Sequence, residues 1–435
     1  MPPATRGASG AQQPDALTPS SATTTATAED LRHRPGSRGL RRTQLALFGA
    51  GLATFLLLYS TQALLPALSA DLHLTPGQAS LTVSAAAIGL ALAVIPVSAL
   101  SEKFGRTRVM TASVFAAVAL AVVIPFSPDL TVLTALRALQ GVALAGLPAT
   151  AMAYLAEEVH PSALPSAMGL YVAGNSIGGM SGRLVSGMVA GEFGWRWGLA
   201  SVAVLSLLCA VGFRLLIPRA QHFRPGAVNP RALLRTVSGH LHNPLLGRLF
   251  LLGMLFMTVF GAVYTVMGYR LVTAPFNLSQ GLASSIFAVY VFGTFASALS
   301  ARITGRFGRR GTLYLAIVLT SAGLLLTLPA SLPSALLGLV LITAGFFTGH
   351  CVASASVGRT ATHGRAQAAA LYLAAYYLGN SLGGTLGADA YHSAGWDGTV
   401  VVGLGAMVLA AGITLYATAR AHVAARAAGP VAALR

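Results

Sequence analysis

The sequence predicts an all-α protein that crosses a membrane many times. Of its 435 residues, 55% are hydrophobic and only 9% are charged, whereas soluble domains average about 25% charged residues. Twelve apolar segments follow one another along the chain, each long enough to cross about 30 Å of hydrocarbon. The links between them carry most of the charged residues, which is the pattern of a multi-pass membrane protein.

The apolar segments form two sets of six, separated by a polar, Arg-rich linker. The first set lies near 44–66, 79–100, 109–127, 130–152, 168–190 and 196–217. The second set lies near 245–268, 282–303, 312–328, 334–357, 366–388 and 397–418. We therefore expect the following order: a tail at 1–42, a helical bundle at 43–217, a linker at 218–244, a second bundle at 245–418 and a tail at 419–435. The N-terminal tail is polar throughout and is predicted to be disordered.

The distribution of basic residues predicts the orientation. Of the 28 Lys and Arg residues, only Arg196 and Arg270 fall in links on one side, and Arg137 and Arg183 fall within helices. The remaining bases gather on the other side, which marks it as cytoplasmic. Both termini are thus predicted to be cytoplasmic, with the protein in the plasma (inner) membrane. Because the net charge of +17 is spread over links, it serves orientation, and no nucleic-acid partner is expected. The three tryptophans are expected to start helices at the outer interface: Trp195, Trp197 and Trp396.

A short charged link joins the second and third apolar segments. Its basic residues Lys103, Arg106 and Arg108 would each cost about 2.5 kcal/mol or more within hydrocarbon, so the link lies in water. Gly105 is expected to provide the backbone freedom for the chain reversal. Glu102 is expected to approach the positive N-terminal end of the eleventh helix, near 364–367, and to help close the cytoplasmic side.

Two motifs of the first half recur in the second. Arg306-Phe-Gly308-Arg309 repeats Lys103-Phe-Gly105-Arg106. The nine residues from Tyr171, which include Asn175, match the nine from Tyr376, which include Asn380. Since an even number of helices separates the copies, they have the same orientation in the membrane. The pattern predicts a parallel duplication about an axis along the membrane normal.

At these motifs the chain resembles the major facilitator superfamily, over residues 44–420. The family motif between helices two and three is matched by Ser98, Leu100, Glu102, Lys103, Gly105 and Arg106, with Arg108 one position late. The fourth-helix motif is present as Arg137, Gln140 and Gly141, and the fifth-helix antiporter motif as Gly174, Asn175, Gly178 and Gly179, with Asn175 in place of the family's proline. The resemblance implies two pseudo-symmetric six-helix halves around a central cavity, and is strongest to the twelve-helix sugar-efflux and drug-efflux branches.

Ionisable residues inside the membrane are the first candidates for function. Arg137 is either a structural residue bound by helix carbonyls or a cavity residue, and the resemblance implies a role in proton coupling or substrate contact. Asp389 is the acid best placed to titrate within the membrane, if Arg183 approaches it in one conformation; its alternative is an interfacial position. His350, near the middle of the tenth helix, either bonds a neighbouring helix or carries a proton.

Polar residues of helices one and seven are candidates for substrate binding by hydrogen bonds, since these helices line the central cavity in the family. They are Tyr59, Gln62 and Tyr264. Gln140, Asn175 and Asn380 complete the candidate set through the motifs that contain them. The glycines of the fifth helix are expected to allow close helix packing: Gly174, Gly178, Gly179, Gly182 and Gly187.

These observations predict a secondary active transporter of a small organic solute, with proton-coupled efflux as the leading hypothesis. Proton-coupled uptake, uniport and a transporter-like solute sensor are the alternatives. The sequence has no metal-ligand spacing, nucleophile elbow or phosphate loop, so neither an enzyme nor a cofactor is expected, and the proton is the expected coupling ion. A monomer in contact with membrane lipid is predicted, with a neutral or weakly anionic substrate.

Overall fold

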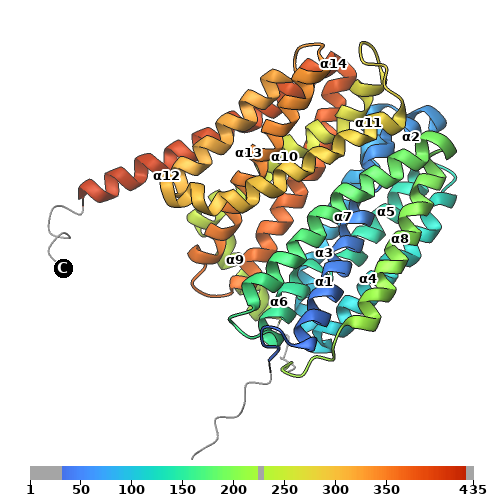
Figure 1. Ribbon diagram of the computed structural model, residues 1–435. Coiled ribbons are helices and arrows are strands. Elements are labelled where there is room, and N and C mark those ends of the chain that lie inside the picture. Colours follow the sequence, from blue (N-terminus) through green and yellow to red (C-terminus); the bar gives the residue numbers. More distant parts are fainter. Residues whose placement is uncertain (1–31, 224–229, 428–435) are drawn as a thin grey trace, which may run out of the picture. The chain divides into compact units, whose positions relative to one another are not determined.

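The computed structural model describes residues 32–223 and 230–427, whose regular elements are helices. Residues 1–31 of the predicted N-terminal tail, 224–229 of the predicted linker and 428–435 of the C-terminal tail lie outside this description. Figure 1 shows the helices of the first half, coloured blue to green, side by side, and those of the second half, coloured yellow to red, side by side.

The first set of helices covers residues 38–216. It consists of α1 (Arg38–Tyr59), η1 (Gln62–Leu64), α2 (Leu65–Leu72), α3 (Pro76–Phe104), α4 (Arg106–Val123), η2 (Ile124–Phe126), α5 (Leu130–Leu144), α6 (Pro148–Glu158), α7 (Leu164–Phe193) and α8 (Trp195–Leu216). α1 begins at Arg38, where the Ser37 hydroxyl accepts a hydrogen bond from the Leu40 amide. The last residues of the predicted tail, 38–42, are therefore helical.

The second set of helices follows the linker. It consists of α10 (Pro244–Val272), α11 (Gln280–Ser285), η3 (Ile286–Val289), α12 (Tyr290–Leu326), α13 (Leu332–Thr360) and α14 (Arg365–Ala427). The linker itself contains an amphipathic helix, α9 (Pro230–Leu241), that the sequence analysis did not predict. α14 also continues past the predicted end of the second bundle at 418.

Eight helical stretches of the described chain are long and apolar enough to cross a membrane. Two of them contain a break, at Gly308 within α12 and at Ala394–Gly395 within α14. The glycines of these breaks have positive φ angles of 68° and 63°, as do Gly105 and Gly194 at 98° and 85°. Because such angles are accessible mainly to glycine, each residue allows a sharp change of direction between two apolar segments. The prediction for Gly105 is confirmed.

Glycine allows α7 to pack directly on the backbone of α1. A Cβ atom on Gly178 would lie 2.4 Å from the carbonyl oxygen of Leu52. The same arrangement recurs between α14 and α10, where a Cβ on Gly383 would lie 2.0 Å from the carbonyl oxygen of Thr258. Gly174 and Gly182 on α7 meet carbonyl oxygens of α1 in the same way, and Gly379 on α14 meets one of α10; Gly387 on α14 faces Ala262 of α10. The predicted role of the fifth-helix glycines in close packing is therefore confirmed at Gly174, Gly178 and Gly182.

The tryptophans that follow Gly194 and Gly395 start helical segments, as expected, and their side chains are buried. Trp195 is 3% exposed and donates a hydrogen bond to Asp71 at 2.8 Å. Trp396 is 7% exposed and donates one to Thr327 at 3.0 Å. The indoles of these two residues fasten the start of their helix to a neighbouring link, whereas Trp197 is exposed. We call this end of the helices the Trp195 end and the opposite one the Arg106 end.

Candidate functional site

Hydrogen bonds join the first and second sets of helices near the Trp195 end. The Tyr269 hydroxyl of α10 donates to the carbonyl oxygen of Leu65 at 3.0 Å and lies 2.7 Å from the Ser69 hydroxyl. Gln280 of α11 donates to the carbonyl oxygen of Ala63 at 2.5 Å. These contacts connect α2 and η1 to α10 and α11, so the two sets are held together at this end.

Gln62 links the same boundary to a buried charge. Its amide nitrogen donates to the Thr265 hydroxyl of α10 at 3.0 Å, and its amide oxygen accepts from the Nε of Arg183 at 2.7 Å. Gln62 is 2% exposed. A single side chain of η1 thus connects to α7 and α10.

Arg183 lies in a cage of aromatic rings. Its side chain is 1% exposed, and its Nη1 donates to the carbonyl oxygen of Gly179 at 2.6 Å. The guanidinium carbon lies 4.0 Å from the ring centre of Tyr59, 4.7 Å from that of Tyr290 and 5.3 Å from that of Phe287. Distances below about 6 Å allow a cation–π attraction. Because Tyr290 and Phe287 belong to the second set of helices, the cage spans the boundary between the sets.

Arg137 has a different environment. It is 0% exposed, and its guanidinium donates to the carbonyl oxygens of Thr82, Leu57 and Leu58 at 3.0, 2.8 and 2.5 Å. A fourth bond goes to the side-chain oxygen of Gln140, which itself donates to the carbonyl oxygen of Ala117. This geometry favours the structural alternative for Arg137, which ties α5 to α1 and α3.

His350 and Tyr264 belong to an aromatic cluster in the second set of helices. The His350 ring is half-buried, with its Nδ1 3.0 Å from the Tyr372 hydroxyl and its centre 4.9 Å from that of Tyr376. Tyr264 is fully buried, and its hydroxyl lies 2.5 Å from that of Thr343. Stacked and edge-on rings connect the two residues through the following phenylalanines: Phe260, Phe346 and Phe347. His350 therefore borders the same aromatic cluster that extends to the Arg183 cage through Tyr264 and Tyr290.

Asp389 lies near the Trp195 end and is exposed. Its carboxylate faces the first turn of α3, where a Cβ on Gly77 would lie 1.9 Å from the Asp389 Oδ1. This is the position of the interfacial alternative. The recorded contacts of Arg183 are with Gln62, Gly179 and the three rings, so Asp389 and Arg183 are not paired in this conformation.

Asn175 and Asn380 occupy corresponding places on α7 and α14. Asn175 faces Gly51 of α1, where a Cβ would lie 2.4 Å from its side-chain oxygen. The Oδ1 of Asn175 and the Nδ2 of Asn380 are both buried without a hydrogen-bond partner among the described residues. Buried polar atoms without partners are costly, so both asparagines are suited to bonds made in another conformation or with a solute.

The charged motif at the Arg106 end is organised around Arg106. Its guanidinium bonds the Glu157 carboxylate at 2.9 Å and the Ser101 hydroxyl at 2.6 Å. Lys103, Arg108, Arg306 and Arg309 are exposed. The first copy of the motif therefore contains an ion pair, whereas the arginines of the second copy face outward beside the Gly308 break.

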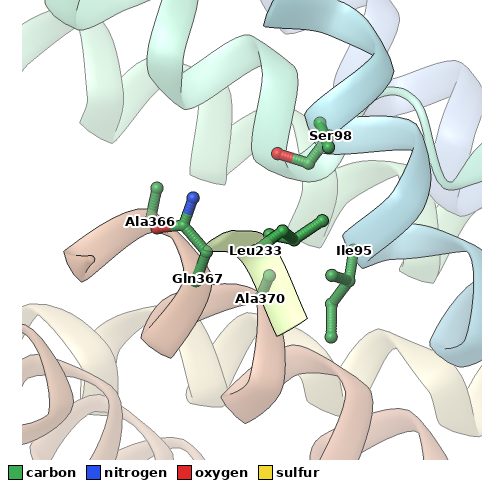
Figure 2. Close-up of a pocket in the computed structure, with 7 residues that line it drawn as sticks. Ile95, Ser98, Leu233, Ala366, Gln367 and Ala370 are labelled. Atoms are coloured by element: carbon green, nitrogen blue, oxygen red, sulfur yellow. The ribbon is translucent and has the colours of Figure 1, made fainter. Parts of the chain in front are cut away.

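Glu102 is half-buried close to the start of α14. Figure 2 shows a small pocket, with Ile95 and Ser98 of α3 on one side and Ala366, Gln367 and Ala370 of α14 on the other; Leu233 of α9 also lines it. Ser98 lies one helical turn before Glu102, so this part of α3 approaches the first turns of α14; the approach of Glu102 itself to that helix end stays a prediction. Within the described chain, the structure records no hydrogen bond or ion pair for Glu102.

A buried carboxylate near the Arg106 end was missed by the sequence analysis. Glu158 is 1% exposed and accepts hydrogen bonds from the amides of Gln221 and His222 at 2.9 and 2.8 Å. Its second oxygen lies 3.0 Å from the His222 Nδ1. The His33 amide donates to the Glu158 carbonyl oxygen at 2.8 Å. Burial lowers the pKa of His33, which Glu158 partly opposes and His222 reinforces.

Tyr290 and Phe287 were also missed, although they complete the Arg183 cage. The sequence offers no charge or motif at these positions, and only the approach of η3 to α7 gives them a role. Their aromatic side chains within a predicted helix were compatible with ordinary packing.

A sequence profile described as Major Facilitator Superfamily matches residues 47–275. The chain is 40% identical over 367 residues to the uncharacterized MFS-type transporter YybF of Bacillus subtilis, covering 84% of this chain and 91% of that protein. It is 38% identical over 363 residues to the inner membrane transport protein YnfM of Escherichia coli, covering 83% of this chain and 87% of that protein.

The fold has a close counterpart among solved structures. A bacterial homolog of the human lysosomal transporter Spinster, in an inward-facing and unoccupied conformation, superposes with a TM-score of 0.71 at 17% identity, covering 88% of this chain and 98% of that one. The sequence relatives, the matched profile and the apolar helices agree with one another. The chain belongs to the Major Facilitator Superfamily and is a multi-pass membrane transporter, not an enzyme.

Proposed function

We propose that this transporter moves a small organic solute by alternating access of two six-helix halves. The observation that carries the proposal is the repeated glycine contact of α7 with α1 and of α14 with α10. Repeated packing of this kind is expected if each half is a rigid bundle of the same construction. The breaks at Gly308 and Gly395 each divide one apolar stretch into two spans. If α5–α6 and α7 also cross the membrane, the chain crosses it twelve times.

The proposed halves are the predicted bundles 43–217 and 245–418, joined by the linker 218–244. The first half begins as early as Arg38, in line with the start of α1. The excess of bases near the Arg106 end makes that end cytoplasmic, with both termini on the same side. The Trp195 end then faces outward, and the contacts of Tyr269, Gln280 and Gln62 support an outward side that is closed in this conformation.

Protons are the proposed coupling ion, and efflux is the proposed direction. His350 is the favoured carrier because it is half-buried beside the aromatic cluster, where a change in its charge would be felt by several neighbours. Asp389 is the second candidate, since it faces α3 across the boundary between the halves.

A neutral or weakly anionic substrate suits the charges of the buried groups. Arg183, Arg137 and His350 are basic or neutral. The acids of the described chain lie near helix ends or breaks: Asp71, Glu102, Asp129, Glu157, Glu158, Glu192, Asp389 and Asp397. A strongly cationic solute would therefore have no counter-charge within the membrane.

A substrate screen in proteoliposomes with an imposed pH gradient tests the proposed function. We expect at least one neutral or anionic solute to move faster than in protein-free liposomes. The His350→Gln variant should lose gradient-driven flux while it retains exchange without a gradient, and the Asp389→Asn variant should retain both. Loss of driven flux in Asp389→Asn alone would assign the proton to Asp389. Driven flux in both variants would place the coupling proton on another group, whereas flux of the unaltered protein that does not respond to the pH gradient would indicate uniport. Transport restricted to cations would overturn the proposed substrate class.

A further inference from the structure

Arg183 has fewer hydrogen-bond acceptors than a buried guanidinium requires. A guanidinium has five N–H donors, and hydrogen bonds are recorded for the Nε and Nη1 of Arg183 only, to Gln62 and Gly179. Arg137, equally buried in the same protein, makes four. Arg137 therefore has acceptors for four of its five N–H groups, whereas Arg183 has them for two and retains more capacity to donate.

The charge of Arg183 also lacks an acidic partner in the described chain. The ion pairs recorded there involve Arg106, Arg196 and His222. The faces of the aromatic rings attract the guanidinium, and among the described residues no hydrogen bond from Arg183 to the Tyr59 or Tyr290 hydroxyl is recorded. Because a buried charge is normally paired, the missing anion is best supplied from outside the chain.

A second, independent observation points to the same ligand. The Tyr290 hydroxyl is buried without a hydrogen-bond partner among the described residues, and the ring of this 6%-exposed tyrosine lies 4.7 Å from the Arg183 guanidinium carbon. A hydroxyl and a guanidinium that both need an acceptor are satisfied together by one carboxylate, which has two oxygens and about four lone-pair positions.

The two donors come from opposite halves. Arg183 belongs to α7, and its ring partner Tyr59 ends α1, whereas Phe287 and Tyr290 belong to η3 and α12. In the present conformation the rings of η3 and α12 cover the guanidinium. Separation of the halves at the Trp195 end would remove these rings and leave the Arg183 charge accessible.

We propose that Arg183 and Tyr290 together bind the carboxylate of the transported solute, which is an aromatic monocarboxylate. This inference rests on the proposed transport function and names its substrate class. One unpaired guanidinium matches one negative charge. The adjoining rings are apolar and offer both faces and edges to an aromatic body, since Phe260 and Phe346 stack on each other and Phe347 stands edge-on to both.

Binding to the purified full-length protein in detergent tests the proposal without a transport assay. Benzoate and phenylacetate are the probes, and benzamide is the control of similar size without charge. Titration calorimetry at neutral pH should give saturable binding of at least one of the two carboxylates, at least tenfold tighter than that of benzamide. Equal binding of benzamide, or no binding of either carboxylate, would overturn the proposal.

Variants test whether the carboxylate binds at Arg183 and Tyr290. Arg183→Gln should weaken carboxylate binding at least tenfold, and Arg183→Lys, which keeps the charge, should weaken it less. Tyr290→Phe removes only the hydroxyl and should weaken binding severalfold; it also provides the test if Arg183→Gln does not fold. Arg196→Gln is the matched control, because Arg196 pairs with Asp71 near the protein surface, and it should bind as the unaltered protein does. Unchanged binding in both Arg183→Gln and Tyr290→Phe would contradict the proposal.

The binding experiment and the proteoliposome screen can fail independently, so a failure of the carboxylate site can be told from a failure of the proposed transport function. If the proteoliposome screen finds a transported sugar or another neutral solute and neither carboxylate binds, the carboxylate site is refuted and transport stands. If a carboxylate binds at Arg183 but no solute is transported, the binding site is confirmed and the proposed transport of that anion is refuted.

Discussion

The guanidinium carbon of Arg183 lies 4.0 Å from the centre of the Tyr59 ring. Tyr59 is the last residue of α1, and Gln62, which accepts the Arg183 Nε hydrogen bond, begins η1 directly after it. The buried charge is thus held at the point where α1 gives way to the segment that contacts the second half. A movement of that segment would alter the surroundings of Arg183.

Arg137 is expected to be important for stability because it ties three helices through carbonyl oxygens. Arg137→Lys should lower the free energy of unfolding by about 2 kcal/mol or more, since an ammonium cannot replace the planar set of donors. Thermal unfolding in detergent measures the loss. Arg196→Lys, near the surface, should leave the unfolding temperature almost unchanged. An Arg137→Lys protein as stable as Arg196→Lys would contradict the structural role.

The glycine contacts predict matched effects in the two halves. Gly178→Ala and Gly383→Ala would place a Cβ 2.4 Å and 2.0 Å from carbonyl oxygens of the facing helices. Each should destabilise by about 1–3 kcal/mol through overpacking. Gly212→Ala, where no atom lies within 4 Å of the added Cβ, should be neutral or stabilising, because alanine favours helix. Unfolding temperatures test the comparison, and equal effects at all three positions would count against direct backbone packing.

The charged motif at the Arg106 end predicts an energetic coupling between Arg106 and Glu157. These side chains are 11% and 28% exposed and lie 2.9 Å apart. A double-mutant cycle with Arg106→Gln and Glu157→Gln should give a coupling energy of about 1 kcal/mol in thermal unfolding. The same cycle with Glu102→Gln should be additive. A larger coupling to Glu102 than to Glu157 would show that another conformation dominates in solution.

The packing of the segment around His33 against Glu158, which we call its docking, is expected to depend on pH. Burial lowers the pKa of His33 below its ordinary value of 6.5, while Glu158 opposes and His222 reinforces the shift. The undocked segment therefore takes up a proton more readily. Docking should be complete above pH about 6.5 and should weaken as the pH falls below that value.

Hydrogen exchange of the His33 and His160 amides, which bond the Glu158 and His33 carbonyl oxygens, measures this docking. After correction for intrinsic rates, protection should fall as the pH is lowered from 7.5 to 5.5, by no more than about tenfold per pH unit for one proton. His33→Gln should remove most of the dependence. Protection that rises on acidification would reverse the assigned sign.

The helices and the repeats could be predicted from the sequence because their signals are local. Apolar runs, and glycines such as Gly105 and Gly308 between charged residues, mark where helices end and the chain turns. The candidates Arg183, Tyr59 and Gln62 were each found by residue type and depth, yet their meeting in one cage was not. That meeting depends on how α1 and α7 pack side by side, which one sequence does not reveal.

Pairings across the halves were the least predictable. For Asp389 the sequence left open an approach to Arg183 in one conformation and an interfacial position, and in this conformation it lies exposed against Gly77 of α3. The burial of Glu158 could not be predicted, because its partners are backbone amides of the linker and backbone partners leave no pattern in the sequence. Tyr290 owes its place to the approach of two halves that are distant in sequence.

Two spin-label distances test alternating access most directly, in a protein in which Cys209 and Cys351 have been replaced by serine. One label pair, Glu192 with Leu282, lies where α7 meets α11 at the Trp195 end, and the other, Ser162 with Phe307, lies at the opposite ends of α7 and of the first part of α12. Double electron–electron resonance between pH 5.5 and 8, with and without the solute found in the flux screen, reports both. We expect one distance to lengthen when the other shortens. Distances that stay fixed, or that lengthen together, would contradict it.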